Sequence, residues 1–153
     1  MSKTILPTIV LIIIAFSVLA ENHPLRRFPS AHAKVQGVAL GSTNDEVINN
    51  FGDPIEKHVE PPQFGNLEIT YVYDGLFIHT TDNRVEQITI NSSEYRLGNG
   101  LRVGSTKEKF QEIFGLEDVG EKLSFYIGES NSCFSVFDFK DNLVFQINIY
   151  CAG

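Results

Sequence analysis

Hydrophobic and polar positions along the chain follow two different periods, and each period occurs twice. Residues 38–52 and 101–115 align at an offset of 63, and both contain a Gly-Ser-Thr triplet and a Phe-Gly pair. Apolar residues recur at helical spacing in both, as Val47, Ile48 and Phe51 do in the first. A hydroxyl residue before the apolar run and a glycine after it are helix start and stop signals. Each segment is therefore predicted to form a short helix.

After each predicted helix, apolar and polar residues alternate, which is the period of a half-buried strand. Asp74-Gly75 and Asp82-Asn83 are tight-turn signals in the first unit, and Asp141-Asn142 is one in the second. Each unit is thus one helix followed by a three-stranded antiparallel meander. The predicted strands span about residues 67–73, 76–81 and 85–91 in the first unit, and 123–128, 133–139 and 144–150 in the second.

The predicted fold class is α+β, with two tandem repeats of this unit. Repeat 1 spans residues 37–97 and repeat 2 spans residues 98–153. The loop between the helix and the strands is longer in repeat 1, and it contains the prolines of that repeat. Residues 21–36 contain two prolines, two histidines and three basic residues but no apolar period, so they are predicted to form an extended leader.

Residues 1–20 have the pattern of a secretory signal peptide, with Lys3 in a short basic region, an apolar stretch and small residues before Glu21. The apolar segment is shorter than the roughly 20 residues needed to cross a bilayer. A retained anchor is the alternative to cleavage. The sequence predicts cleavage after Ala20, a periplasmic or secreted protein, and no stable membrane span after cleavage.

Charge and composition narrow the classes of partner. The 153-residue chain has 12 basic and 19 acidic residues, and a net charge of -7. Removing residues 1–20 deletes Lys3 alone, which leaves 11 basic and 19 acidic residues, or -8. An acidic chain lacks the basic stripe that nucleic acid requires. Nucleic acid is therefore excluded as a partner, whereas the 17 aromatic residues can supply a core.

Both cysteines, Cys133 and Cys151, lie in the exported part, where an even number favours a disulfide. A strict two-residue turn at Asp141-Asn142 would place Cys133 opposite Tyr150, whereas a bulge or a three-residue loop would place it opposite Cys151. We expect the disulfide together with an irregular hairpin. Two buried free thiols are the alternative.

The motif Gly-Ser-Thr-x-x-Glu-Val-x-x-x-Phe-Gly-x-Pro at residues 41–54, with strands that end in Val-x-x-Ile-x-Ile, resembles the SmpA/OmlA (BamE) envelope lipoprotein domain. Two such units in tandem resemble the β-lactamase inhibitor protein (BLIP) architecture. The resemblance implies helices packed on one face of a curved sheet, with the other face gripping another protein. The chain departs from these families because it lacks the lipidated cysteine, and repeat 1 has no cysteine.

Chemistry-bearing motifs are sparse. The four histidines are widely spaced and form no ligand cluster, so no metal site is predicted. No nucleophile elbow or phosphate-binding loop occurs, and no cofactor is implied. His79 and Glu86 are the one acid–base pair that the hairpin at Asp82-Asn83 could bring together, and a surface cross-strand pair is the alternative. The protein is therefore predicted not to be an enzyme.

Aromatic residues are the stronger functional clue, because both faces of each predicted meander are apolar and helices can cover only one. Tyrosine and phenylalanine on an open sheet are typical binding anchors. The alternative is that the two repeats cover each other's sheets. In repeat 1 the pattern places Tyr71, Tyr73, Leu76 and Ile78 opposite Val72, Phe77, Ile88 and Ile90, and in repeat 2 Phe137, Phe139, Val144 and Tyr150 opposite Phe134, Val136, Ile147 and Ile149. The candidate protein-binding residues are Tyr71, Tyr73, Tyr126, Tyr150 and Phe137.

These observations predict an exported, non-catalytic protein-binding module that engages an envelope or secreted protein with its sheet face. An inhibitor or immunity-type protein that blocks a secreted enzyme such as a hydrolase is the alternative, with Asp53, Asp74 and Glu129 filling a basic active site. An enzyme with scattered residues around His79 is a third hypothesis.

Overall fold

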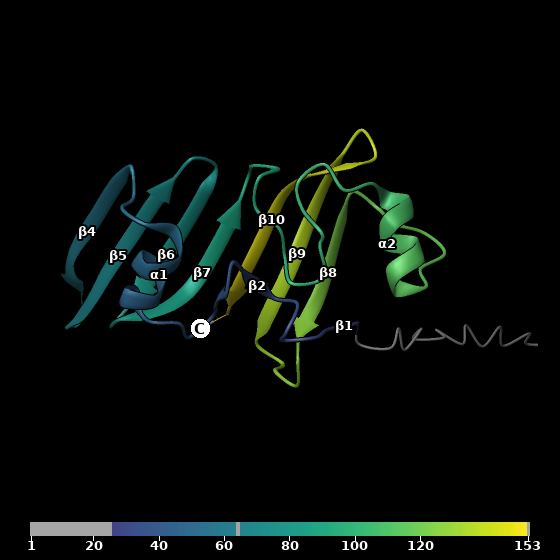
Figure 1. The fold of residues 1–153 in the computed structure, drawn as a ribbon. Coiled ribbons are helices and arrows are strands. Elements are labelled where there is room, and N and C mark those ends of the chain that lie inside the picture. The colour runs from purple at the N-terminus through teal and green to yellow at the C-terminus, as the bar shows by residue number, and fades with distance from the viewer. Residues whose placement is uncertain (1–25, 64, 153) are drawn as a thin grey trace, which may run out of the picture.

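The protein is described by a computed structural model that covers residues 26–63 and 65–152, which form a large sheet, a small hairpin and two short helices (Figure 1). The predicted signal peptide, residues 1–20, lies outside the described residues. Within the described part of the chain, no helix is long and apolar enough to cross a membrane. The helices are α1 Asn44–Phe51 and α2 Lys107–Phe114, and the strands are β1 Arg27–Phe28, β2 Lys34–Val35, β3 Val38–Ala39, β4 Glu56–Gln63, β5 Asn66–Tyr73, β6 Leu76–Thr81, β7 Arg84–Ile90, β8 Lys122–Ile127, β9 Cys133–Lys140 and β10 Leu143–Cys151.

Eight strands form one mixed sheet in the order β1-β8-β9-β10-β7-β6-β5-β4, and β2 pairs with β3 in a separate hairpin. All neighbours in the large sheet are antiparallel except β1 and β8, which are parallel. The predicted α+β class is confirmed in this form, mostly β with an open sheet and two short helices. Strands β7 and β10 pair directly, so the two predicted meanders lie side by side rather than face to face.

Both predicted helices are confirmed, and each begins at a threonine. The Thr43 hydroxyl accepts from the backbone N–H of Glu46 at 3.2 Å, while the Glu46 carboxylate accepts from the N–H of Thr43 at 2.7 Å. This reciprocal pair is a capping box, and the Thr43 N–H is the main cause that lowers the pKa of Glu46. The Thr106 hydroxyl caps α2 by accepting from the N–H of Lys109 at 3.3 Å. Gly115 ends α2 in the left-handed conformation that glycine adopts without strain.

Two segments that the sequence pattern leaves irregular are folded. Residues 26–36, expected to be an extended leader, contribute β1 and β2, and the Phe28 side chain is fully buried. The proline-bearing segment after α1, expected to be a loop, forms β4 against β5. Its register breaks between Glu60 and Gln63, where two consecutive prolines stand. Proline is tolerated there because β4 is an edge strand, which does not need every N–H for pairing.

One buried row of side chains crosses the sheet in register and shows which face the helices cover. The row consists of Tyr73, Leu76, Ile90, Ile147, Phe137 and Leu123. Phe51 of α1 packs on Tyr73 with ring centroids 5.5 Å apart, and Phe110 of α2 packs on Phe137 at 4.8 Å. Both helices therefore pack on the same face of the sheet, and one core runs beneath them.

A bulge in each half corrects the predicted assignment of side chains to faces. Gln87 pairs with His79 but Val85 pairs with Thr80, so Glu86 is an extra residue in β7. The equivalent irregularity in β10 leaves Phe145 without a partner. Because each extra residue reverses the alternation after it, the assignments predicted for Ile88, Ile90, Ile147 and Ile149 are wrong, and all four are buried on the helix side. Tyr150, predicted on the same face as Phe137 and Val144, lies on the opposite face beside Phe134.

The predicted disulfide between Cys133 and Cys151 is confirmed. Asp141 and Asn142 form a tight turn with positive φ angles of 51° and 65°, which pairs Lys140 with Leu143. The bulge at Phe145 then shifts the register so that Cys133 lies directly opposite Cys151. The expected irregular hairpin is confirmed, and the irregularity is a bulge in the strand rather than a longer turn.

Loss of the disulfide is predicted to destabilise the fold without changing its register. The two cysteines are 18 positions apart, so closing this loop contributes about 3 kcal/mol in the chain-entropy model. The double variant Cys133→Ser/Cys151→Ser should lose about that much free energy of unfolding in urea titration. Wild-type protein unfolded under reducing conditions is the control and should match the variant. An unchanged mass on reduction, instead of a gain of two hydrogens, would show that no disulfide forms.

Alkaline pH is predicted to destabilise the protein through Tyr73, whose hydroxyl donates to the Gly52 carbonyl at 3.1 Å. Burial raises the pKa of Tyr73 to about 12, from 10 in a model compound. The unfolded state therefore releases the proton first, so the free energy of unfolding declines as pH rises from 10 towards 12.

Tyr73→Phe should remove part of this decline at the cost of about 1 kcal/mol near neutral pH, because the hydrogen bond to Gly52 is lost. Urea titrations from pH 8 to pH 12 measure both effects. Phe51→Leu, which weakens the same ring contact but keeps the hydroxyl, is the control and should retain the alkaline decline. An equally steep decline in Tyr73→Phe would contradict this role.

Candidate functional site

The face of the sheet opposite the helices, which we call the open face, is covered by neither α1 nor α2. In Figure 1, α1 and β2 lie in front of the sheet and the open face is turned away from the viewer. Its side chains come from the strand positions that alternate with the buried ones. The alternative that the two halves cover each other's sheets is wrong, since the halves share one sheet.

One row of open-face side chains crosses every strand of the large sheet in register. Neighbouring strands lie about 4.8 Å apart, so this cross-strand row extends about 34 Å. Its first half is basic and aromatic, and its second half is polar. In spatial order, the row consists of Arg27, Tyr126, Phe134, Tyr150, Gln87, His79, Thr70 and His58.

Three aromatic rings, Tyr126, Phe134 and Tyr150, stack along the first half and form what we call the aromatic ladder. Ring centroids are 4.9 Å apart between Tyr126 and Phe134, and 5.7 Å apart between Phe134 and Tyr150. All three rings are partly exposed. Such tilted contacts are favourable beyond the area that they bury. The ladder therefore holds three aromatic side chains in fixed positions on an accessible surface.

Arg27 closes the outer end of the aromatic ladder. Its guanidinium carbon lies 5.7 Å from the centroid of the Tyr126 ring. The same guanidinium donates to the carbonyl oxygens of Gly128 and Ser130, both at 2.9 Å, and to the Asn131 side chain at 3.0 Å. These contacts join β1 to the loop that follows β8, so the N-terminal segment orients the ladder.

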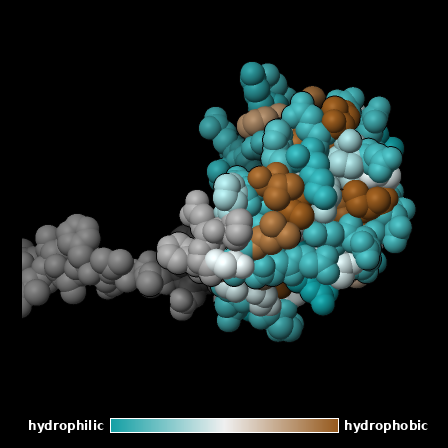
Figure 2. Space-filling model, turned by 90° about the vertical axis from the view of Figure 1, so that its left-hand side faces the viewer, coloured by the Kyte–Doolittle hydropathy of each residue, from teal (hydrophilic) through white to brown (hydrophobic). Residues whose placement is uncertain are grey.

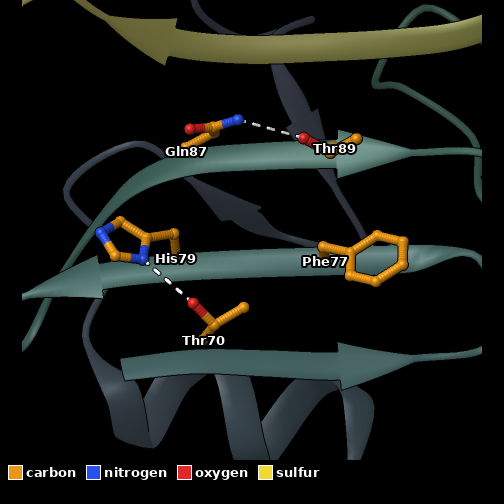
Figure 3. A pocket seen from close by; sticks show the side chains of 5 residues that line it. All are labelled: Thr70, Phe77, His79, Gln87 and Thr89. Atoms are coloured by element: carbon orange, nitrogen blue, oxygen red, sulfur yellow. Dashed lines mark hydrogen bonds between the residues drawn. The ribbon is translucent and has the colours of Figure 1, made fainter. Parts of the chain in front are cut away.

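A shallow hollow of about 260 Å³ occupies the polar half of the row (Figure 3). Its lining residues are Thr70, Phe77, His79, Gln87 and Thr89, which project from three adjacent strands. The Thr70 hydroxyl lies 3.1 Å from Nδ1 of His79, and Nε2 of Gln87 donates to the Thr89 hydroxyl at 3.3 Å. The hollow thus presents hydroxyl, amide and imidazole groups beside one exposed ring.

A second hollow, of about 280 Å³, continues from the first at Gln87 and reaches Tyr150 and Lys122. A chain of polar contacts runs beside it, in which the Thr89 hydroxyl donates to Asn148 at 2.9 Å. Lys122 lies 3.2 Å from Asp138, so the charges of this pair compensate each other. The two hollows and the aromatic ladder therefore form one continuous surface whose centre is polar but carries little net charge.

The predicted pairing of His79 with Glu86 is wrong. Glu86 is the bulge residue, and its carboxylate accepts from the Thr81 hydroxyl at 3.0 Å instead. The residue directly opposite His79 is Gln87, and the nearest carboxylate lies 3.8 Å from Nε2 and belongs to Glu68. Nowhere in residues 26–63 and 65–152 do three or more His, Cys, Asp or Glu side chains gather as a metal site would require.

The five candidate binding residues divide between the two faces. Tyr126 and Tyr150 lie on the open face, where Phe134 joins them. Tyr71, Tyr73 and Phe137 are buried beneath the helices, with exposed fractions of 2%, 7% and 0%. Their expected place on an exposed face is therefore corrected, because they belong to the core.

Phe134 and Gln87 are among the site members that the sequence did not propose for binding, as are Arg27, Thr70 and His58. The signal that identifies Phe134 is the disulfide, because pairing Cys133 with Cys151 places Phe134 directly opposite Tyr150. No comparable signal identifies Gln87, since its position depends on the pairing between β7 and β10.

The acidic loop residues of the inhibitor hypothesis do not come together. Asp74 lies in the β5–β6 turn and Glu129 in the β8–β9 loop, and these connections are at opposite ends of the strands (Figure 1). Asp53 follows α1 in the segment before β4. All three are exposed, but they form no single acidic surface.

Comparisons with known proteins give similar structures but no family. No protein-family model matches the chain, and no curated protein matches it. The uncharacterized protein yfeY from Escherichia coli is similar in structure, with 12% identity and a TM-score of 0.47, over 82% of this chain and 99% of that one.

Two larger extracellular or secretory proteins are also similar in structure. One is an extracellular protein containing an SCP domain from Bacillus anthracis, with 10% identity and a TM-score of 0.44, over 73% of this chain and 44% of that one. The other is a cysteine-rich secretory protein from Staphylococcus aureus, with 13% identity and a TM-score of 0.38, over 83% of this chain and 50% of that one. The chain thus spans about half the length of these two proteins.

These findings correct the resemblance to the SmpA/OmlA and BLIP families, because no such family model matches and the similar structures belong to other proteins. The disulfide remains independent evidence about location. Disulfides persist in oxidising compartments, so the Cys133–Cys151 bond is consistent with a place outside the cytoplasm.

Proposed function

We propose that this chain is an exported, non-catalytic protein-binding module that contacts an envelope or secreted protein through the open face. The observation that carries the proposal is the aromatic ladder of Tyr126, Phe134 and Tyr150, fixed in register beside two polar hollows. The predicted signal peptide and the disulfide support a periplasmic or secreted location.

The chemistry of the open face suits a protein partner. Tyrosine and phenylalanine bury large areas at a low cost in side-chain entropy, and such residues dominate binding energy at interfaces. The surrounding amides and hydroxyls can exchange hydrogen bonds with a partner's backbone. A stable interface needs about 800 Å² on each side, and a surface that crosses eight strands has room for it.

The paired charges on the open face support a nearly neutral interface rather than one that depends on electrostatic attraction. Lys122 is paired with Asp138, and His58 lies 3.1 Å from Glu56. The acidic loop residues of the inhibitor hypothesis are separated along the strands, so no single observation favours that function. We therefore propose the binding module alone.

We also propose that residues 37–97 and 98–153 are two copies of one ancestral unit. Equivalent hydrogen bonds precede the two helices. The Gly41 N–H donates to the Val85 carbonyl at 2.7 Å, and the Gly104 N–H donates to the Val144 carbonyl at 2.8 Å. The bulges one residue after Val85 and Val144 are also equivalent. These matches extend the sequence repeat to backbone detail, and they explain why the sheet offers one long open face.

Photo-crosslinking from the open face tests the proposed function. A benzophenone amino acid in place of Phe134, in the exported protein made by its own cells, is expected to give one discrete crosslinked protein. The same probe at Glu112, an exposed position on α2, is the matched control and should give none. Equal crosslinking from both positions, or none from Phe134, would contradict the proposal.

The double variant Tyr126→Ala/Tyr150→Ala should lower the crosslinking yield about tenfold or more, because each aromatic anchor contributes over 1 kcal/mol at a typical hot spot. Its melting temperature should remain within a few degrees of wild type, since both rings lie outside the core. Phe145→Ala removes an exposed ring outside the cross-strand row and should leave the yield unchanged. A yield equally sensitive to Phe145→Ala would show that no specific anchor exists.

A further inference from the structure

One edge of the large sheet is covered by a short strand, whereas the other edge is free. At one edge, β1 covers β8 through hydrogen bonds from Tyr126 to Arg26 and from Gly128 to Phe28, both at 2.9 Å. At the other edge, β4 pairs with β5 on its inner side, and no strand of the described chain pairs with its outer side. Figure 1 shows β4 as the last strand on the left. Its outer backbone groups are therefore available for pairing.

Three exposed apolar side chains and Lys57 make up the helix-side surface around β4. Val59 lies opposite the buried Ile69 in the register, so it belongs to the helix side, yet 56% of it is exposed. Leu67 of β5 and Ile55, the residue before β4, are 44% and 70% exposed. Figure 2, viewed from this side, shows hydrophobic patches set within polar surface. Side chains of an added strand would cover part of these patches.

The open side of β4 is acidic. Glu56 and Glu60 alternate with His58 along the strand. His58 Nε2 lies 3.1 Å from the Glu56 carboxylate, and Glu60 lies directly opposite Glu68 of β5. Like charges directly opposite each other destabilise a sheet. A cation placed beside Glu60 would relieve this repulsion, and the Lys57 ammonium does not do so, because it lies over the Tyr71 ring on the other side of the sheet. The edge is therefore complementary to a strand with basic residues on one side and apolar residues on the other.

We propose that β4 binds an extended segment of a partner protein as an added antiparallel strand, with alternating basic and apolar side chains. Basic residues of that segment face Glu56 and Glu60, and apolar residues face Val59 and the side chain of Lys57, whose ammonium lies over the Tyr71 ring, with Ile55 just beyond the stretch. The addition stops before Pro61, because Pro61 and Pro62 have no N–H and the register breaks there. The paired stretch is thus about five residues long, Glu56–Glu60.

A second copy of this chain fits the edge poorly. Two β4 strands paired antiparallel around His58 would place Glu56 of each copy opposite Glu60 of the other. Such a dimer would add two carboxylate pairs to the existing opposition of Glu60 and Glu68. A different, basic segment avoids this repulsion.

The edge proposal goes beyond the open-face proposal, because the aromatic ladder and the β4 edge lie on different strands. Strand β8, which carries Tyr126, is six strand positions away from β4, or about 29 Å. Loss of the aromatic ladder leaves the edge intact, and variants of the edge leave the ladder intact. The failure of one proposal can therefore be distinguished from the failure of the other.

Peptide binding tests the edge proposal on the mature protein. The probe is a fluorescent seven-residue peptide of alternating lysine and valine that begins with lysine. The control replaces its central valine with proline, which keeps the charge but breaks strand pairing. Anisotropy titration should show at least about tenfold weaker binding of the proline peptide. Equal affinity for the two peptides would overturn the proposal, because it would mean attraction by net charge alone.

The same protein and peptides also test where the peptide binds and whether the β4 edge prefers basic residues. Hydrogen exchange should slow at the amides of residues 56–60 when the lysine–valine peptide binds, and should not change in β8. The variant Glu56→Lys/Glu60→Lys should reverse the preference towards a glutamate–valine peptide, while Tyr126→Ala/Tyr150→Ala should bind the lysine–valine peptide as wild type does. Binding without protection of β4, or a protein that dimerises through β4 in the absence of peptide, would overturn the proposal.

Discussion

A single extra residue in each half of the sheet decides which side chains reach the core and which reach the open face. Glu86 in β7 and Phe145 in β10 are the bulge residues. Strand side chains alternate with a period of two, so each bulge reverses the alternation after it. Val85 and Ile88 both face the helices although they are three residues apart. The core, the disulfide and the cross-strand row all depend on these two reversals.

The bulges also allow the two halves to join. Ile88 lies opposite Ile149 and Ile90 opposite Ile147 at the β7–β10 pairing, and all four side chains are buried. The two halves have 61 and 56 residues, a size at which a single core is marginal. Pairing along β7 and β10 merges the two cores into one. Phe28 from β1 adds to the second half, where its ring centroid lies 5.7 Å from those of Phe125 and Phe137.

Local signals account for what the sequence predicts correctly. The helices and the tight turns depend on residues close together in the chain, and the disulfide follows from the cysteine number and the predicted compartment. Strands β1 and β4 were missed because their pairing partners, not their own composition, make them strands. The assignment of Tyr71 and Tyr73 to an exposed face failed because the bulge at Glu86 places Ile88 and Ile90 on the same side as these tyrosines, and a bulge leaves no trace in hydrophobic periodicity. Tyr126 and Tyr150 were identified, but their connection through Phe134 required the register.

Because the two faces of the sheet are separate, substitutions on the open face can alter binding without altering the core. Side chains beneath the helices determine stability, whereas those of the cross-strand row contact no helix and can be substituted to fit a binding partner. The row ends at His58, which is also the centre of the proposed pairing stretch in β4. The open face and the free edge therefore meet at one residue. A partner whose folded part covers the aromatic ladder could place an extended segment along β4, and the two weak contacts would then reinforce each other by effective concentration.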